Sequence, residues 1–227
     1  MNLMQQYYMQ GYLHQSFTDT PVRQELIRVI TDIHEGHIRP GFTLEEKYAR
    51  SKALRPSVHA YDPVFLNILF DQALPKMLKD VTGFDLHLVH VQLRISYPGE
   101  SYMDWHRDTH IYNGKVVGNI PPVHKVIVYP DVGAKGDPKL HVIPGSHRRQ
   151  FGNKYIDVAQ TRLLKHATIS SSNMHYLMFN TGLFHAVVPE PRETGSWRLI
   201  YSFAHDFQVA QFVSEQPLIE AYRQRRV

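Results

Sequence analysis

The feature that most constrains the fold of this chain is a change in the spacing of its apolar residues near Leu86. Before this point, apolar residues recur every three or four positions, as they do on one face of a helix. After it, apolar and polar residues alternate in short runs that are separated by turns containing Gly and Pro, as they do in β-strands. Helices followed by closely spaced strands predict a β-sandwich or barrel that is covered by helices.

The first part of the chain is predicted to contain two helical regions and a loop. Residues 1–37 are interpreted as helical, with Pro21 near the start of the periodic part, and a second helix pattern covers 62–83. The polar and basic stretch 38–60 between them predicts a surface loop or lid. The tail is predicted to be helical from Gln216. Strands are predicted at 88–96, 123–129, 139–143, 167–169, 174–179, 185–188 and 196–203.

The length of 227 residues predicts a single domain, 1–227. We assign 1–83 to N-terminal helices and a lid loop, 84–206 to a barrel core, and 207–227 to a C-terminal tail.

The absence of cysteine excludes disulfides, thiolate metal sites and a cysteine nucleophile. No apolar run approaches the ~18 residues that span a bilayer, and the N-terminus does not look like a secretory signal. We therefore expect no membrane partner and a cytoplasmic location. The net charge of +4 is dispersed along the chain, which does not favour a nucleic-acid partner.

Two predicted strands carry polar side chains on one face. In 88–96, the polar residues His90, Gln92, Arg94 and Ser96 alternate with the apolar residues Val89, Val91, Leu93 and Ile95. Such a polar face lies in water on an edge strand or lines a cavity, and the nearby His106 favours the cavity. In 196–203, Arg198, Ile200 and Ser202 alternate with Trp197, Leu199, Tyr201 and Phe203. Burying an arginine side chain inside the protein costs free energy unless a carboxylate pairs with it. The carboxylate of a bound ligand could form two hydrogen bonds with its planar guanidinium.

His106 and Asp108 form the chain's single His-x-Asp or His-x-Glu pair. Residues i and i+2 of a strand face the same side, so the pair supplies two ligands of a 2-His-1-carboxylate site for Fe(II). Random order of the same composition would give about one such pair, so the interpretation depends on a second imidazole. His185 follows a glycine turn and opens a strand, and Arg198 comes 13 residues later. The alternatives of a surface His106, a core His185 and an Arg198 paired with a structural Asp stay open at this point.

His106-x-Asp108, His185 and Arg198 together resemble the signature of Fe(II)/2-oxoglutarate-dependent dioxygenases. More narrowly, the chain is similar to the phytanoyl-CoA dioxygenase branch, which includes ectoine hydroxylase. The likeness covers roughly residues 60–205. The supporting stretches are Gln92-Leu93-Arg94-Ile95-Ser96, Asp104-Trp105-His106-Arg107-Asp108 and a turn that ends in Pro144-Gly145-Ser146-His147.

The resemblance implies a double-stranded β-helix of the jelly-roll or cupin type. His106, Asp108 and His185 would bind Fe(II), and 2-oxoglutarate would chelate the metal and place its C5 carboxylate on Arg198. Gln92 matches a position that faces the co-substrate in relatives, whereas the role of Ser202 beside the C5 carboxylate is inferred from strand alternation. Ser96 stands where relatives carry asparagine, which puts a role for it in doubt. Arg94, Arg107 and Trp105 are predicted to contact substrate, although alternation turns Arg107 away from the metal unless the strand bends.

The implied reaction uses O2 to hydroxylate an unactivated C–H bond of a small metabolite or natural-product intermediate, and it releases succinate and CO2. Asp108 favours hydroxylation, because halogenating relatives replace this carboxylate with a small residue. Loops 38–60, 109–122 and 145–165 are expected to frame the substrate. An anionic group on the substrate is favoured by the basic residues Arg94, Arg107, Lys125, Arg148 and Arg149. The alternatives are a cupin-type metalloenzyme that does not use 2-oxoglutarate and a ligand-binding barrel. A nucleic-acid demethylase would carry a second arginine six residues after Arg198, where this chain has Ala204.

Overall fold

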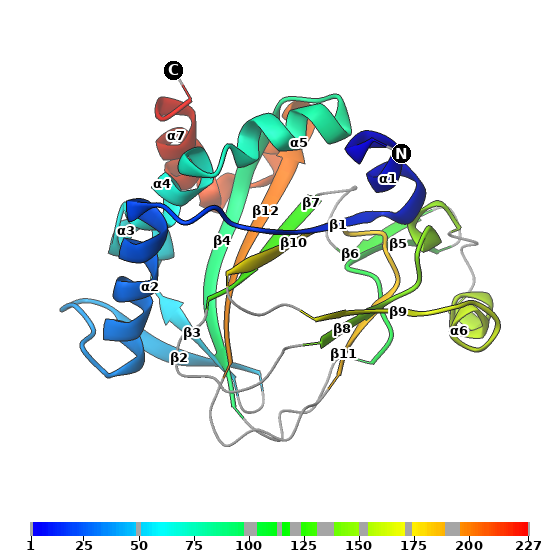
Figure 1. Ribbon diagram of the computed structural model, residues 1–227, viewed down its shortest axis with the longest axis horizontal. Helices are drawn as coiled ribbons and strands as arrows, with labels where there is room; N and C mark the ends of the chain where they lie inside the picture. The colour runs from blue at the N-terminus through cyan, green and yellow to red at the C-terminus, as the bar shows by residue number, and fades with distance from the viewer. Residues whose placement is uncertain are drawn as a thin grey trace.

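Two antiparallel sheets face each other, and helices cover the outer side of the larger one (Figure 1). The computed structural model describes residues 2–48, 51–97, 104–112, 115–118, 124–130, 139–149, 154–170, 174–188 and 196–226. The larger sheet has the order β1 (Tyr12–Ser16), β10 (His175–Asn180), β7 (His124–Tyr129), β12 (Ser196–His205), β4 (Leu86–Ser96), β3 (Ser51–Arg55) and β2 (Thr43–Tyr48). The smaller sheet has the order β11 (His185–Val188), β8 (Lys139–Val142) and β9 (Ala167–Ser170), and β5 (Thr109–Tyr112) pairs with β6 (Lys115–Gly118).

The predicted double-stranded β-helix is confirmed by this arrangement. Strands β10, β7, β12 and β4 form one wall, and β11, β8 and β9 form the other. His106 extends the second wall, because its backbone makes an isolated antiparallel bridge with His185 at the start of β11. The strand regions predicted from the alternating pattern all lie in these two walls, as far as the structure describes them.

The helices lie at the outer side and the ends of the walls. They are α1 (Leu3–Gln10), α2 (Pro21–His34), α3 (Val58–Tyr61), α4 (Val64–Asp71), α5 (Leu74–Thr82), the 3-10 turn η1 (Ser146–Arg148), α6 (Lys154–Leu163), the 3-10 turns η2 (Asp206–Gln211) and η3 (Val213–Glu215), and α7 (Gln216–Gln224). No described helix has the length and apolar character needed to cross a bilayer.

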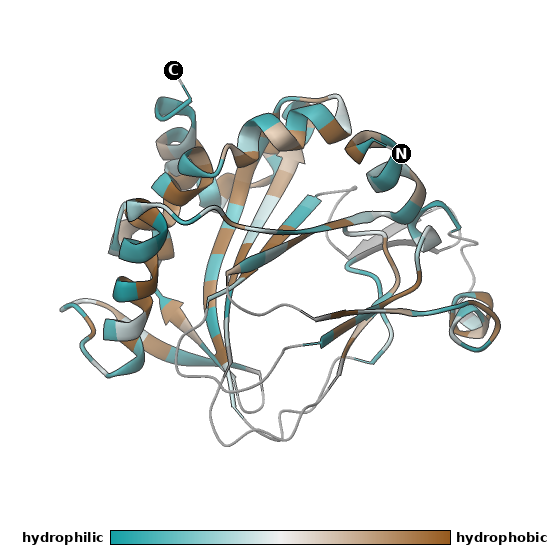
Figure 2. Cartoon of the chain, viewed as in Figure 1, coloured by the Kyte–Doolittle hydropathy of each residue, from teal (hydrophilic) through white to brown (hydrophobic). Residues whose placement is uncertain are grey.

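The main core fills the space between the helices and the outer face of the larger sheet. Along β4 and β12, alternate residues point into it, and Figure 2 shows the alternation on β4 as teal and brown segments. The inward-facing set is Val91, Leu93, Ile95, Trp197, Leu199, Tyr201 and Phe203, which pack against Leu26, Ile30 and Ile33 of α2 and Phe65 and Leu69 of α4. Burying this many large apolar side chains fixes both strands in register, since a slip of one residue would turn every one of them to the opposite face.

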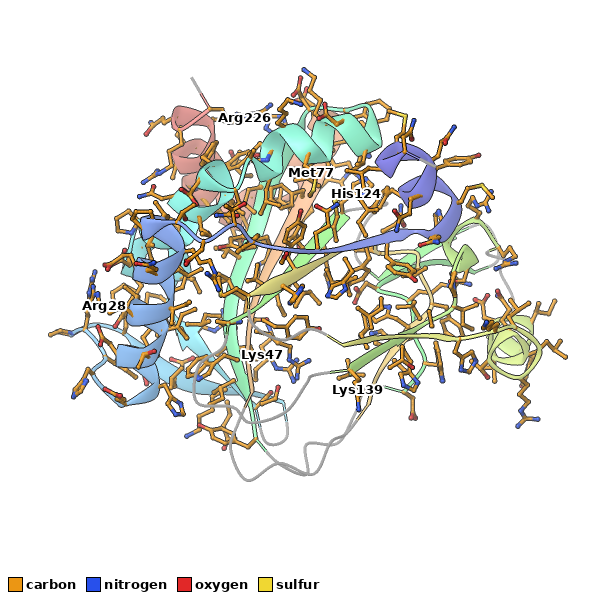
Figure 3. All side chains as sticks on the ribbon, in the orientation of Figure 1. Arg28, Lys47, Met77, His124, Lys139 and Arg226 are labelled. Carbon is orange, nitrogen blue, oxygen red and sulfur yellow. The ribbon has the colours of Figure 1, made fainter. Side chains whose placement is uncertain are left out.

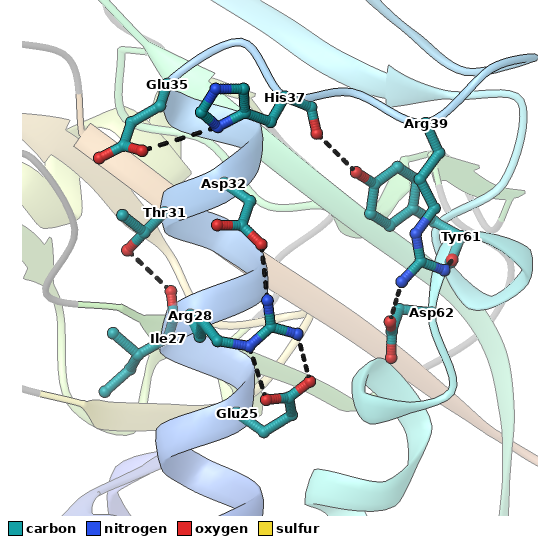
Figure 4. Close-up of polar contacts among 10 residues, drawn as sticks. All are labelled: Glu25, Ile27, Arg28, Thr31, Asp32, Glu35, His37, Arg39, Tyr61 and Asp62. Atoms are coloured by element: carbon teal, nitrogen blue, oxygen red, sulfur yellow. Dashed lines mark hydrogen bonds and ion pairs between the residues drawn. The ribbon is translucent and has the colours of Figure 1, made fainter.

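Helix α2 begins as the sequence predicts. Thr20 caps it by accepting a hydrogen bond from the Arg23 amide at 3.1 Å, and Pro21 occupies the first turn. Its outer face carries the ion pairs of Arg28 with Glu25 and Asp32, and Arg39 beyond its end pairs with Asp62 at 2.6 Å (Figure 4). The last pair attaches the segment after α2 to the start of α4.

The prediction that 1–37 is helical throughout is wrong for residues 12–16. Gly11 ends α1 with φ +84, a backbone conformation that favours glycine, and β1 then adds to the sheet beside β10. The prediction of a loop over 38–60 is also wrong in part, because β2 and β3 form a hairpin on the edge of the larger sheet. The strand β2 is polar because it lies at a sheet edge, where polar side chains are favoured.

Three smaller predictions also need correction. The second helical region is broken into α4 and α5 at Ala73, which has φ 51. Residues 109–112 and 115–118, predicted as loop, pair as a hairpin. Val89 does not share the face of Val91, because a β-bulge opposite Ser202 and Phe203 inserts one extra residue and shifts the alternation. As a result Val89 packs with Val209 and Ile219 at the C-terminal segment.

Candidate functional site

His106, Asp108 and His185 come together between the two walls. One ligand atom from each lies within 4.8 Å of those of the other two. The two imidazole centroids are 4.2 Å apart. The backbone of His106 donates to and accepts from the backbone of His185, both at 2.9 Å, so the sheet itself holds the two segments side by side. His106 and His185, almost 80 residues apart in sequence, therefore present their imidazole rings side by side.

Hydrogen bonds to the backbone orient both imidazoles. Nδ1 of His106 lies 2.8 Å from the carbonyl of Asp104, and Nδ1 of His185 lies 2.9 Å from the carbonyl of Leu183. A carbonyl accepts only, so Nδ1 carries the proton in both rings and Nε2 carries the lone pair. Each Nε2 lies 3.9 Å from a carboxylate oxygen of Asp108. This backbone support is the kind of outer contact that fixes metal-binding histidines.

The charge states of this cluster suit metal binding at neutral pH. Burial lowers the pKa of His185 to about 4, which keeps its imidazole neutral. Burial alone would raise the pKa of Asp108, but Lys125 and the two imidazoles outweigh it and hold that pKa below its ordinary value. The Lys125 ammonium donates to Oδ2 of Asp108 at 2.8 Å. The donor set therefore includes a neutral imidazole at His185 and an ionised carboxylate at Asp108.

A cavity of about 460 Å³ opens beside this cluster. Its polar lining includes the predicted residues Gln92, Arg94, Arg198 and Ser202 as well as the three candidate ligands. Its remaining lining consists of Lys47, Val89, His90, Lys125, Ile127, Tyr129, Leu140, Phe179, Val187, Ile200, Gln211, Phe212, Ser214 and Glu215. The volume is within the range of small-molecule sites.

The register of β4 and β12 sets the order of polar groups along the cavity wall. Arg198 lies opposite Arg94, and Ser202 lies opposite His90. Arg198 donates from Nη2 to Oγ of Ser96 at 2.5 Å, so Ser96 helps to fix its guanidinium. Nε2 of Gln92 is buried and has no hydrogen-bond acceptor among the residues that the structure describes. A buried amide that can still donate suits a polar ligand in this cavity.

Arg107 and Trp105 do not line the cavity. Alternation around His106 turns both of them to the other side of the wall, as predicted for Arg107. Arg107 is buried, pairs with Asp157 of α6 at 3.0 Å, and donates to the carbonyls of Ser146 and Gly182. Trp105 packs against Phe184 and His166 at centroid distances of 5.6 and 4.7 Å. These positions give no support to the substrate contacts predicted for them.

Several lining residues are absent from the sequence interpretation. Lys47 reaches the cavity from β2, within the stretch predicted as a lid (Figure 3). Residues 211–215, predicted as part of a tail, form another side of it through Gln211, Phe212, Ser214 and Glu215. No described residue of the predicted loop 145–165 lines the cavity. Of the predicted loop 109–122, residues 113–114 and 119–122 lie outside the described residues. Lys125 on β7, one of the basic residues expected near the site, does line the cavity.

No protein-family model matches the chain, and no curated protein sequence is significantly similar to it. Solved structures do match. HygX from Streptomyces hygroscopicus, with nickel, 2-oxoglutarate and hygromycin B bound, has a TM-score of 0.63 and 18% identity over 88% of this chain and 85% of its own. The non-heme alpha ketoglutarate dependent carbocyclase SnoK from nogalamycin biosynthesis has a TM-score of 0.65 and 12% identity over 88% and 81%. EctD from S. alaskensis with bound Fe has a TM-score of 0.63 and 14% identity over 89% and 75%.

These likenesses concern the fold. These three proteins are associated with different molecules: one HygX structure holds hygromycin B, SnoK is a carbocyclase, and a second EctD structure holds 5-hydroxyectoine. What they share with this chain is the pair of facing sheets, over almost nine-tenths of its length. The chain thus has the double-stranded β-helix fold of these iron-, nickel- and 2-oxoglutarate-binding proteins.

Proposed function

We propose that this protein is an Fe(II)- and 2-oxoglutarate-dependent oxygenase. It hydroxylates a C–H bond of a small metabolite or natural-product intermediate and releases succinate and CO2. The observation that carries the proposal is the convergence of His106, Asp108 and His185 on one side of a cavity that also holds Arg198. Two imidazoles and one carboxylate are the donor set of non-heme Fe(II) oxygenases, which leave coordination positions for other ligands.

The residues fit the metal by their chemistry as well as their spacing. Borderline Fe(II) accepts imidazole nitrogen and carboxylate oxygen, and both rings present Nε2 without a proton. Lys125 holds Oδ2 of Asp108 by a hydrogen bond, so Oδ1 is the oxygen better able to serve as a ligand. Lys125 is in this way a positioning residue for the carboxylate.

Bound Fe(II) with 2-oxoglutarate and O2 supplies the oxidising chemistry, and the protein supplies binding and orientation. Arg198 presents a guanidinium whose position is fixed by Ser96, which suits bidentate capture of the C5 carboxylate. Gln92 and Ser202 lie on the same cavity wall and offer further donors to the co-substrate. The apolar part of the lining includes Ile127, Phe179, Val187 and Ile200, which would help to keep water from the reacting bond.

Turnover of 2-oxoglutarate tests this function directly. With Fe(II), O2 and ascorbate, the protein is expected to release succinate with saturable dependence on 2-oxoglutarate. Arg198→Ala should raise the KM for 2-oxoglutarate by roughly 30-fold or more, because loss of one partner of a buried charged pair costs about 2–5 kcal/mol. Arg28→Ala, on the outer face of α2, is the matched control and should leave KM unchanged. If succinate release were insensitive to Arg198→Ala, Arg198 would have no role in binding 2-oxoglutarate.

A further inference from the structure

His90 lines the cavity, yet the proposed reaction gives it no role. Its imidazole is partly buried, and burial lowers its pKa to about 4, with Lys47, Lys125 and Arg55 acting in the same direction. The ring is therefore neutral at neutral pH. Neither ring nitrogen makes a hydrogen bond with any residue that the structure describes. A neutral imidazole both donates and accepts a hydrogen bond, so His90 suits a ligand group that does the same, such as a hydroxyl.

The position of His90 along the sheet is level with the candidate metal ligands and not with Arg198. Ser202 of β12 lies opposite His90 of β4 and also opposite Lys125 of β7. Lys125 in turn contacts the Asp108 carboxylate at 2.8 Å. Arg198 is four residues from Ser202 along β12, which corresponds to about 13 Å at roughly 3.3 Å per residue. A ligand group beside His90 therefore lies near the metal and away from the C5 carboxylate of the co-substrate.

The C-terminal segment closes the cavity at this same end. Phe212 packs against the small core cluster that contains Val89, the chain neighbour of His90. Arg55 acts electrostatically on both His90 and Glu215, which places these two side chains close to the same guanidinium. Four residues of the segment line the cavity, namely Gln211, Phe212, Ser214 and Glu215.

The polar side chains of this segment are available for hydrogen bonds to a ligand. Burial raises the pKa of Glu215, and Arg55 acts in the opposite direction. The Glu215 carboxylate makes no hydrogen bond or ion pair with the described part of the chain. Gln211 and Ser214 are exposed at the cavity mouth, and within the described ranges their side chains have no hydrogen-bond partner either. An imidazole, an amide, a hydroxyl and a carboxylate thus border one end of the cavity.

Neutral hydroxyl groups match this set better than other kinds of ligand group. An apolar group would cover the imidazole and the carboxylate without pairing with them, which costs free energy. An anionic group would be repelled by Glu215, and a cationic group would be repelled by the cations that act on His90. Hydroxyls donate and accept, so they pair with all four polar groups. Phe212 adds an apolar surface for the C–H face of a ring.

We propose that His90 and Glu215, together with Gln211 and Ser214, form a subsite for a neutral hydroxylated ring of the substrate, a sugar or a cyclitol. The inference deepens the proposed function and rests on it, because it places this ring next to the C–H bond that is oxidised at the metal. The anionic group expected from the basic residues is disfavoured at this end of the cavity, since that expectation did not include Glu215.

Rings of matched shape and different charge test the subsite. D-glucose, D-glucuronate and D-glucosamine share a ring and most hydroxyls, myo-inositol is a neutral cyclitol, and cyclohexanol keeps a ring with a single hydroxyl. Binding is measured by saturation-transfer NMR with 2-oxoglutarate present and Zn(II) in place of Fe(II), so that no turnover occurs. Glucose or inositol should bind saturably and more tightly than the charged sugars, and cyclohexanol should bind more weakly than either. Tighter binding of a charged sugar than of both neutral rings would overturn the inference.

Variants of His90 and Glu215 test the two central contacts. His90→Leu should weaken binding of the neutral ring about threefold to tenfold, the contribution of one hydrogen bond, and His90→Gln should retain part of that affinity. His37→Leu is the matched control, because His37 is exposed and does not line the cavity. Glu215→Gln should reduce the preference for glucose over glucuronate by about fivefold, because it removes a like charge. Glu220→Gln, an exposed position of α7 outside the cavity, should keep the preference.

The outcomes separate this inference from the proposed function. The visible charge-transfer band of Fe(II) with 2-oxoglutarate reports the cofactor site, and it should be the same in wild type and His90→Leu. If the band forms and no neutral ring binds saturably, the subsite is refuted and the oxygenase assignment stands. Equal affinities of His90→Leu and His37→Leu for the neutral ring also refute the subsite. If the band does not form but ring binding depends on His90, the proposed function fails, and the ring is then the ligand of a binding barrel and not a substrate.

Discussion

Arg107 and Asp108 are neighbours in sequence but lie in different surroundings. Asp108 faces the cavity, where Lys125 holds it ionised, and Arg107 faces away into a buried ion pair with Asp157. The alternation of a strand predicted this separation for Arg107. The partner could not be predicted, because Asp157 is 50 residues away and reaches Arg107 only through the packing of α6.

The burial of His124 leads to a prediction about how stability depends on pH. His124 is buried, its Nδ1 lies 2.6 Å from the Tyr7 hydroxyl, and burial, then His205 and His147, lowers its pKa to about 3. The unfolded chain has the ordinary value near 6.5, so it binds more protons than the folded one between these values. The contribution of His124 to stability is therefore complete above pH 6.5 and is lost as the pH falls toward 3.

His124→Gln should flatten this part of the pH dependence. The free energy of unfolding of the variant, measured by urea titration, is expected to fall less steeply between pH 6.5 and 4, by up to about 1.4 kcal/mol per pH unit. The partly buried His90 and His147 and the buried His185 remain in both proteins, so the difference between the two curves reports on His124. If the free energies of unfolding of wild type and His124→Gln fell equally steeply with pH, the low pKa of His124 would be contradicted.

At the scale of elements, Arg107 connects the two segments that carry the candidate ligands. It donates to the carbonyl of Gly182, shortly before His185, and to the carbonyls of Ser146 and Arg149 in the turn after β8. Asp157 on α6 completes the cluster and also accepts from Gln160 at 3.0 Å. The cluster ties the His106 segment, the β8 turn, α6 and the β11 segment into one unit.

Arg107→Met is expected to destabilise the fold by roughly 3–5 kcal/mol, because it leaves Asp157 buried without its cation. It should also weaken metal binding, since the His106 and His185 segments lose a shared support. Arg28→Met removes two exposed ion pairs and should change neither property appreciably. Urea unfolding and metal titration measure the two effects separately. Wild-type metal affinity in Arg107→Met, at a temperature where it is folded, would show that Arg107 supports only the fold.

The sequence predicted the strands of the barrel better than its N-terminal additions. The faces of β4 and β12 follow from simple alternation, apart from the bulge at Val89. Strand β1 could not be predicted in this way, because its pairing partner β10 lies more than 150 residues further on and only Leu13 of β1 is deeply buried. The β2–β3 hairpin has the polar composition of a loop and becomes a strand pair only at the edge of the sheet.

At the scale of the molecule, the candidate metal ligands and Arg198 could be singled out from the sequence, because the order and spacing of these residue types suit an iron site. The polar faces of β4 and β12 predicted a cavity, but the rest of its lining could not be predicted, since it comes from parts with no such signal. Lys47 comes from an edge hairpin, and Glu215 comes from a segment whose position depends on α7 packing against the outer core through Leu218 and Tyr222. The lining beyond β4 and β12 is therefore known only from the structure.

The most direct test of the central claim is an anaerobic titration of the protein with Fe(II) and 2-oxoglutarate, followed by visible absorption. We predict a weak metal-to-ligand charge-transfer band that saturates at one Fe(II) per chain. His106→Ala should abolish it, whereas His166→Ala, an exposed histidine outside the cavity, should retain it. A band that is unchanged in His106→Ala would contradict the metal site and the oxygenase function together.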